Sequence, residues 1–146
     1  MSDVNTNWIT FEQGVERIRR AVGKDFDQQS RIITSRDADV GKLQTKLKVG
    51  GVPDGFEKWQ LPVYLSGPSQ LFISAAPPNA EVGEHSHDAG DGIRFMVGGS
   101  IYYAGKELTA GDWMYIPQGK RYAFKAGAMG AVMCYCYCCC CVPRLE

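Results

Sequence analysis

Two histidines, His85 and His87, are the residues whose type and spacing most directly suggest chemistry, and the chain has no other histidine. On a β-strand, residues i and i+2 project from the same face, so both imidazoles would point into one space. Two imidazoles in one space could share a metal ion. The spacing therefore predicts a metal-binding pair whose remaining protein ligands are not histidines.

All six cysteines lie in the segment 133–142. On a strand, Cys134, Cys136, Cys138 and Cys140 would share one face, and the separation between neighbours would be at the upper limit for a disulfide. We expect reduced thiols that act as small apolar residues of the last strand, which runs into a tail. A thiolate site for Cu(I) or Zn is the alternative, although the spacing differs from the separated cysteine pairs of structural zinc sites.

The elements that must position these residues are mostly short strands. After Arg31 the chain consists of runs rich in Ile, Val, Tyr, Phe and Trp, separated by Gly, Pro, Asn and Asp, a pattern typical of a sandwich or a barrel. The segment 37–51 is ambiguous. The predicted strands are Arg31–Ser35, Trp59–Leu65, Gln70–Ala75, Ile93–Val97, Ser100–Tyr103, Asp112–Ile116, Arg121–Lys125 and Ala131–Cys138.

One amphipathic helix is predicted near the N-terminus. Thr10 followed by Gln13 is a capping-box pattern, and Gly23 ends the helical run. We expect this helix to pack on the barrel or on a partner subunit. Its apolar positions are Phe11, Val15, Ile18 and Val22.

The stretch from Pro77 to Gly127 resembles the two conserved motifs of the cupin superfamily. The first family motif reads H-x-H, three or four residues, an acidic residue, six residues and Gly. With three residues, the acidic position falls on Asp91 and the glycine on Gly98. With four residues, these positions fall on Gly92 and Gly99.

The second family motif reads G, five residues, P-x-G, two residues, His, three residues, Asn. Gly111 and the run 117–119 match its first half. The family's third metal-binding His falls on Tyr122 and its Asn on Ala126, while Asn79 replaces the glycine that usually opens the first motif.

The resemblance implies an all-β fold, a single cupin barrel of the jelly-roll or double-stranded β-helix type with an N-terminal helix. We expect a helical arm over residues 1–30, the barrel over 31–142 and a tail over 143–146, which has the look of a cloning remnant. Cupins commonly assemble, and a homodimer is expected.

The resemblance also implies a metal shell of His85, His87 and Asp91. Two histidines with one carboxylate suit non-haem Fe(II) and leave positions open for substrate or oxygen. The expected cofactor is a divalent metal, with Fe as first choice and Zn, Ni or Mn as alternatives. Asp88 or Glu84 could replace Asp91, and a cupin that has lost its metal is the competing interpretation.

Two further residues are expected to act on a substrate. Arg94 follows Gly92 by two residues, so it faces the pocket if Gly92 does, and it would then pair with a carboxylate of the protein or of the substrate. Otherwise it lies on the surface. Tyr122, in the slot of a metal ligand, could be a ligand, a general acid or base, or a pocket wall; as a base it needs a metal or a cation nearby.

Composition excludes several classes of function. Sixteen basic and sixteen acidic residues give a formal charge of zero, and no basic block suggests nucleic-acid binding. No apolar stretch is long enough to span a membrane as a helix, and no secretion signal is recognisable. We expect a cytoplasmic protein.

The sequence therefore predicts a protein that binds a small, anionic molecule. The first hypothesis is an Fe-dependent, dioxygenase-like enzyme that acts on a small organic acid or ketone. The alternatives are a ligand-binding or sensing cupin without turnover, and a metal-dependent isomerase or lyase. A third class is a thiol-based metal carrier that uses the cysteine segment. Fold resemblance alone does not choose among them.

Overall fold

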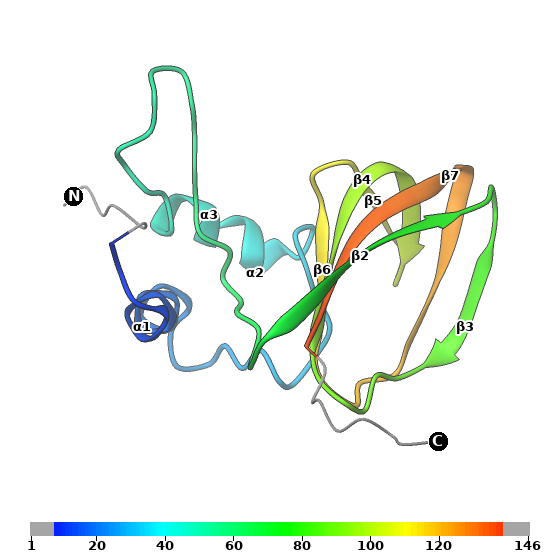
Figure 1. Ribbon diagram of the computed structural model, residues 1–146, viewed down its shortest axis with the longest axis horizontal. Helices are drawn as coiled ribbons and strands as arrows, with labels where there is room; N and C mark the ends of the chain where they lie inside the picture. Colours follow the sequence, from blue (N-terminus) through cyan, green and yellow to red (C-terminus); the bar gives the residue numbers. More distant parts are fainter. Residues whose placement is uncertain (1–7, 139–146) are drawn as a thin grey trace. The chain divides into compact units, whose positions relative to one another are not determined.

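The structure is a computed structural model, and it describes residues 8–138. Its contacts divide the chain into two compact units (Figure 1). Unit 1 comprises Met1–Asp27 and Asp37–Tyr64, and unit 2 comprises Gln28–Arg36 and Leu65–Glu146. The division differs from the expected boundary at residue 30, because the segment 37–64 groups with the helix and not with the strands.

Unit 1 contains three helices in its described part: α1 (Phe11–Val22), α2 (Ala38–Gly41) and α3 (Leu43–Lys46). The predicted capping box of α1 is present, since the Thr10 hydroxyl accepts from the Gln13 backbone and the Gln13 side chain accepts from the Thr10 backbone. Gly23, at φ 82°, ends the helix. The helix prediction is confirmed.

The predicted strand Trp59–Leu65 is wrong. In this segment Trp59 forms an isolated antiparallel bridge with Lys48, and the chain is irregular from residue 61 to residue 68. Pro62 interrupts the run, and proline cannot donate to a strand ladder. The ambiguous segment 37–51 supplies α2 and α3.

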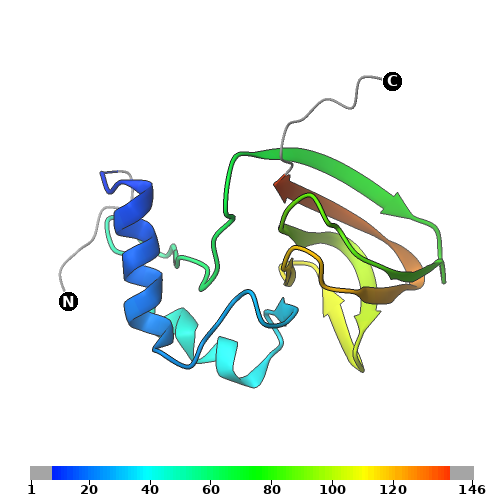
Figure 2. The same cartoon turned by 90° about the horizontal axis from the view of Figure 1, so that it is seen from below.

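Unit 2 is built on an antiparallel sheet of seven strands (Figure 2). The strand order is β1-β6-β4-β7-β2, with β3 added on β7 and β5 on β4. This confirms the expected all-β fold with an N-terminal helix. The strands are β1 (Ile33–Thr34), β2 (Ser69–Ala76), β3 (Glu81–His85), β4 (Gly92–Tyr103), β5 (Lys106–Thr109), β6 (Trp113–Ile116) and β7 (Tyr122–Cys138).

Strand β7 joins two segments that the sequence suggested as separate strands, Arg121–Lys125 and Ala131–Cys138. Its first part pairs with β3 and its second part with β2, while β4 pairs along both. Gly99 and Gly130 lie where these backbones come together, both at positive φ. A Cβ on Gly130 would lie 2.5 Å from the Ala76 carbonyl oxygen, so a side chain has no room there.

The core of unit 2 lies on one face of this sheet. It contains ten buried residues from β4, β5, β6 and β7, among them the site residue Tyr122. The same face carries the conserved-motif residues described next. Within residues 8–138 no helix is both long and apolar enough to cross a membrane.

Candidate functional site

The turn of the second motif holds the loop of the first. The backbone N–H of Gly119 donates to the His87 carbonyl at 2.9 Å, and the Gln118 side-chain amide donates to the Asp88 carbonyl at 2.7 Å. Gly119 has φ 75°, which favours glycine in this turn. The P-x-G run therefore fixes the backbone that carries His87.

His85, His87 and Tyr122 form one cluster of rings. His85 closes β3 and lies opposite Tyr122 on β7, and the two rings are 4.5 Å apart between centroids. The two imidazole centroids are 5.1 Å apart. His87 Nε2 lies 2.9 Å from the Tyr122 hydroxyl, which belongs to a side chain only 3% exposed. The predicted pair thus shares one space with the residue in the third slot.

Arg94 faces the same cluster. Its Nη2 donates to the Tyr122 hydroxyl at 3.2 Å, and its guanidinium carbon lies 4.1 Å from the centroid of Tyr135 and 5.3 Å from that of Phe124. Its Nε is buried and has no hydrogen-bond partner. The inward orientation that strand parity allowed is the one observed.

The lack of a side chain at Gly92 allows the Tyr135 ring to lie beside Arg94. A Cβ on Gly92 would lie 2.8 Å from the Tyr135 hydroxyl, so the absent side chain leaves room for that ring. Gly92 faces the cluster, and this position is the acidic one when four residues separate it from His87. A tyrosine ring therefore occupies the space into which a carboxylate at position 92 would project.

The hydrogen bonds around Tyr122 favour one arrangement of protons. Arginine can only donate, so the Tyr122 oxygen accepts from Arg94 and its own proton is available to His87 Nε2. Burial, with smaller contributions from His85 and Arg94, lowers the pKa of His87 despite the opposing charge of Asp88. A neutral His87 that accepts from Tyr122 satisfies both contacts.

Asp91 is not brought to the histidines. It is 1% exposed, and its carboxylate accepts from the Tyr115 hydroxyl at 2.7 Å and from the Ser66 hydroxyl at 2.8 Å. Gly92, its neighbour, faces the cluster, so alternation directs Asp91 elsewhere. Burial, followed by the bond to Asp91, raises the pKa of Tyr115. Asp91 is a structural residue here.

These positions do not fit the expected metal shell. No three His, Cys, Asp or Glu side chains of the described chain gather as a metal-binding group. His87 Nε2 is engaged by Tyr122, and the Arg94 cation contacts the same hydroxyl. A fixed cation beside the imidazoles opposes the binding of a second one. No step is therefore assigned to a metal.

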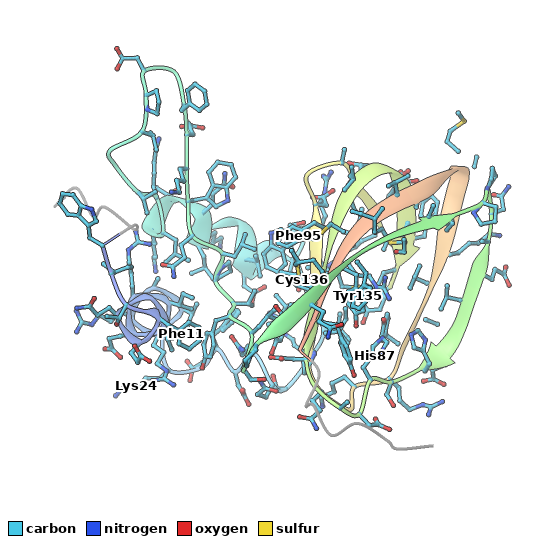
Figure 3. All side chains as sticks on the ribbon, in the orientation of Figure 1. Phe11, Lys24, His87, Phe95, Tyr135 and Cys136 are labelled. Carbon is cyan, nitrogen blue, oxygen red and sulfur yellow. The ribbon has the colours of Figure 1, made fainter. Side chains whose placement is uncertain are left out.

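Two tyrosines of the site were missed by the sequence interpretation. Tyr135 and Tyr137 lie on β7, with ring centroids 5.6 Å and 5.1 Å from that of His87 (Figure 3 labels His87 and Tyr135). Burial raises the pKa of Tyr135, with a further contribution from Tyr122, and its hydroxyl has no partner. Their alternation with Cys134 and Cys136 was the available indication.

The cysteines of β7 point the other way. Cys134 and Cys136 are free thiols, half-buried, on the face opposite to the tyrosines. Burial, followed by the neighbouring Cys134, raises the pKa of Cys136. The expectation of reduced thiols agrees with these two residues, while Cys139, Cys140 and Cys141 lie outside the described residues.

Comparison with known proteins finds structural similarity alone. No family model and no curated protein matches the chain. A structure of Rhodobacter sphaeroides SigE in complex with the anti-sigma ChrR matches at 15% identity and TM-score 0.44, over 50% of this chain and 40% of that one. YhhW from Escherichia coli matches at 14% identity and TM-score 0.39, over 47% of this chain and 29% of that one.

A third similar structure is a cupin protein from Bacteroides fragilis. It matches at 25% identity and TM-score 0.41, over 59% of this chain and 74% of that one. The chain spans less than half the length of the first two structures. Similarity at this level carries no argument about activity, and the cupin resemblance rests on the motif residues of this chain and on the all-β sheet that positions them.

Proposed function

We propose that unit 2 binds a small organic acid whose carboxylate pairs with Arg94. The observation that supports this is the guanidinium itself: its Nε is buried and unpaired, and no carboxylate of the described residues forms a salt bridge with it. Arg94 as a whole is half-buried, but a buried N–H donor on a cation that has no counter-ion is costly. An anionic ligand would supply the missing partner.

The surroundings of Arg94 suit a planar, directional contact. The guanidinium carbon lies over the rings of Tyr135 and Phe124, and Nη2 donates to the Tyr122 hydroxyl, so three side chains restrain the group. A fixed guanidinium can donate two parallel hydrogen bonds to one carboxylate. The rest of the ligand would lie toward His87 and Tyr122.

An iron-dependent oxygenase, the first hypothesis from the sequence, is not part of this proposal. That hypothesis placed Asp91, or Asp88 or Glu84 in its stead, beside His85 and His87. The Asp91 carboxylate instead accepts from Ser66 and Tyr115, and no three His, Cys, Asp or Glu side chains of the described residues gather as a metal-binding group. In this proposal Arg94 binds the carboxylate of the ligand. In an iron enzyme, the metal ion would take that role.

Isothermal titration with benzoate tests the proposal, with neutral benzamide as the matched probe. Benzoate should bind more tightly than benzamide. Arg94→Lys should weaken benzoate binding by about tenfold, because an ammonium cannot reproduce the planar fork, and Arg94→Met should abolish it. Arg121→Met is the control, since Arg121 is an exposed arginine of the same unit that contacts Glu84.

Equal affinity of benzoate for the parent and for Arg94→Met would show that Arg94 does not bind the carboxylate. So would equal affinity of the parent for benzoate and benzamide. Near-ultraviolet circular dichroism of each variant checks that the aromatic cluster keeps its packing.

Proton transfer on a bound acid is a second candidate function, and the His87–Tyr122 hydrogen bond favours it. A phenol with a neutral imidazole behind it can give or take a proton at the substrate. Exchange of the pyruvate methyl protons with D2O tests this by NMR. Tyr122→Phe should retain pyruvate binding and lose the exchange. Exchange at the parent rate in this variant would show that Tyr122 does not transfer the proton.

A further inference from the structure

Unit 1 contains a cavity of about 320 Å³ that is separate from the site in unit 2. Its apolar lining includes Val15 and Ile18 of α1 and Val63, which are buried at 7%, 3% and 7% exposure. Phe11 and Trp59 stand at its edge and are 61% and 41% exposed. The volume lies within the range of small-molecule sites, which are usually apolar with few polar groups.

The walls of this cavity are held by specific hydrogen bonds. Arg17 on α1 donates to the carbonyls of Leu47 and Lys48 at 3.2 Å and 2.7 Å, and to the Gln60 side chain at 2.9 Å. The Gln60 amide in turn donates to the Gly14 carbonyl at 3.1 Å. These bonds tie α1 to Leu47, Lys48 and Gln60, so contacts within unit 1 hold the walls of the cavity in place and reduce the cost of ordering them on binding.

Charge distinguishes one side of the cavity. Lys58 lines it, and its ammonium makes no hydrogen bond or salt bridge with any of the described residues. Its neighbour Glu57 pairs instead with Lys48 at 2.7 Å. The hydroxyl and amide side chains of the lining are already engaged: Gln60 with Arg17 and Gly14, Thr10 with Gln13, and Tyr64 with Arg19.

We infer that this cavity binds an amphipathic monoanion of the fatty-acid type. The aliphatic body would fill the apolar interior between α1 and the segment 58–64, and the carboxylate would meet the Lys58 ammonium at the edge. Burial of the alkyl chain supplies most of the affinity, and the charge selects acids over alcohols of the same length. This inference does not depend on the function proposed for unit 2.

The test compares octanoate with octan-1-ol on the full chain by ¹H–¹⁵N NMR. Both should shift the Trp59 indole and the Gly14 amide in a saturable way, with octanoate the tighter. Lys58→Met should weaken octanoate about fivefold, as expected for a half-solvated ion pair, and leave octan-1-ol unchanged. Lys24→Met, a lysine outside the cavity lining (labelled in Figure 3), is the matched control.

Two results would overturn the inference. One is the absence of saturable shifts in unit 1 with either probe at millimolar concentration. Shifts confined to unit 2 count as this result, because octanoate would then bind at Arg94 and not in the cavity. The other is octanoate binding that is equally tight in the parent and in Lys58→Met. Because Lys58 is exposed, its substitution should leave the fold intact, and the unit 1 spectrum verifies this directly.

Discussion

Tyr122 is the residue that changes the chemistry of this site. A third imidazole in its place would make three neutral nitrogen donors available, whereas the phenol bridges His87 and Arg94 by hydrogen bonds of 2.9 Å and 3.2 Å. Both partners are thereby held, and one of them is a permanent cation. The single replacement fits with a cluster arranged to receive an anion.

His87 predicts a pH dependence of stability. Burial lowers its pKa below the ordinary 6.5, so the unfolded chain takes up a proton at a higher pH than the folded protein does. The free energy of unfolding should therefore fall as the pH drops from about 6.5 toward the lowered pKa of the folded state, and this contribution should be fully present above about 6.5.

Urea unfolding at a series of pH values checks this dependence. His87→Gln removes the titrating group and should flatten the profile below about pH 6.5. His85→Gln leaves the burial of His87 in place and should retain most of the slope. Parallel profiles for the parent and His87→Gln would show that the decline comes from other groups.

Strand β4 carries the second prediction, at the scale of an element. Gly92→Ala places a methyl group 2.8 Å from the Tyr135 hydroxyl, so the ring must move and the stacking on Arg94 is disturbed. Benzoate binding should weaken by about tenfold, since an anchor displaced by a fraction of an ångström loses its directional bonds. Titration of this variant gives the result.

Gly98→Ala is the matched control on the same strand. A Cβ at Gly98 meets nothing within 4 Å. This variant should bind benzoate as the parent does. Equal weakening in both variants would mean that any methyl group added to β4 weakens binding. Unchanged binding in Gly92→Ala would mean that the position of Tyr135 does not affect benzoate binding.

The elements of the site could be predicted from local pattern, but their orientation could not. The capping residues predicted α1, and strand alternation correctly predicted that Arg94 faces the same side of the sheet as Gly92. The spacing after His87 left Asp91 and Gly92 as equal choices, because a shift of one residue reverses the face of a strand. Tyr135 was missed since its approach to Arg94 depends on the long-range pairing of β4 with β7.

Strand β2 adds a consequence for assembly. Among the described strands it pairs with β7 alone, and Leu71, Phe72 and Ile73 are 71%, 49% and 70% exposed. An uncharged, apolar edge strand can pair with another chain. The expected homodimer remains a prediction, and β2 is the edge at which a second copy would add.

At the scale of the whole molecule, unit 2 is discontinuous in sequence. The segment 28–36 supplies β1, which pairs with β6. Ile33 in β1 is fully buried, and the Gln28 side chain donates to the Tyr115 hydroxyl at 3.1 Å. Arg36 pairs with Asp112 at 2.9 Å; burial opposes ionisation of that carboxyl, but hydrogen bonds from Thr109, Arg36 and Ser35 lower its pKa overall.

A chain shortened to residues 65–146 should therefore lose cooperative folding. It lacks β1, so Tyr115 and Met114 of β6, both fully buried in the intact protein, lose their strand partners Ile33 and Thr34. Burial of one large aliphatic side chain contributes about 1.5–3 kcal/mol, and the lost bonds to Tyr115 and Asp112 add to this. The sum is a large share of the ~5–15 kcal/mol that stabilises a typical domain.

Urea titration followed by Trp113 fluorescence measures the effect, because Trp113 is the one tryptophan of this fragment. The control chain begins at Gln28 and replaces residues 37–64 with a flexible Gly-Ser linker, so that β1 is retained while unit 1 is removed. It should unfold in one cooperative transition, whereas the 65–146 fragment should show a shallow, non-cooperative change. A cooperative transition of equal midpoint in the fragment would show that β1 is dispensable and that the residues from Leu65 onward hold Tyr115, Asp91 and the cluster around Tyr122 and Arg94 by themselves.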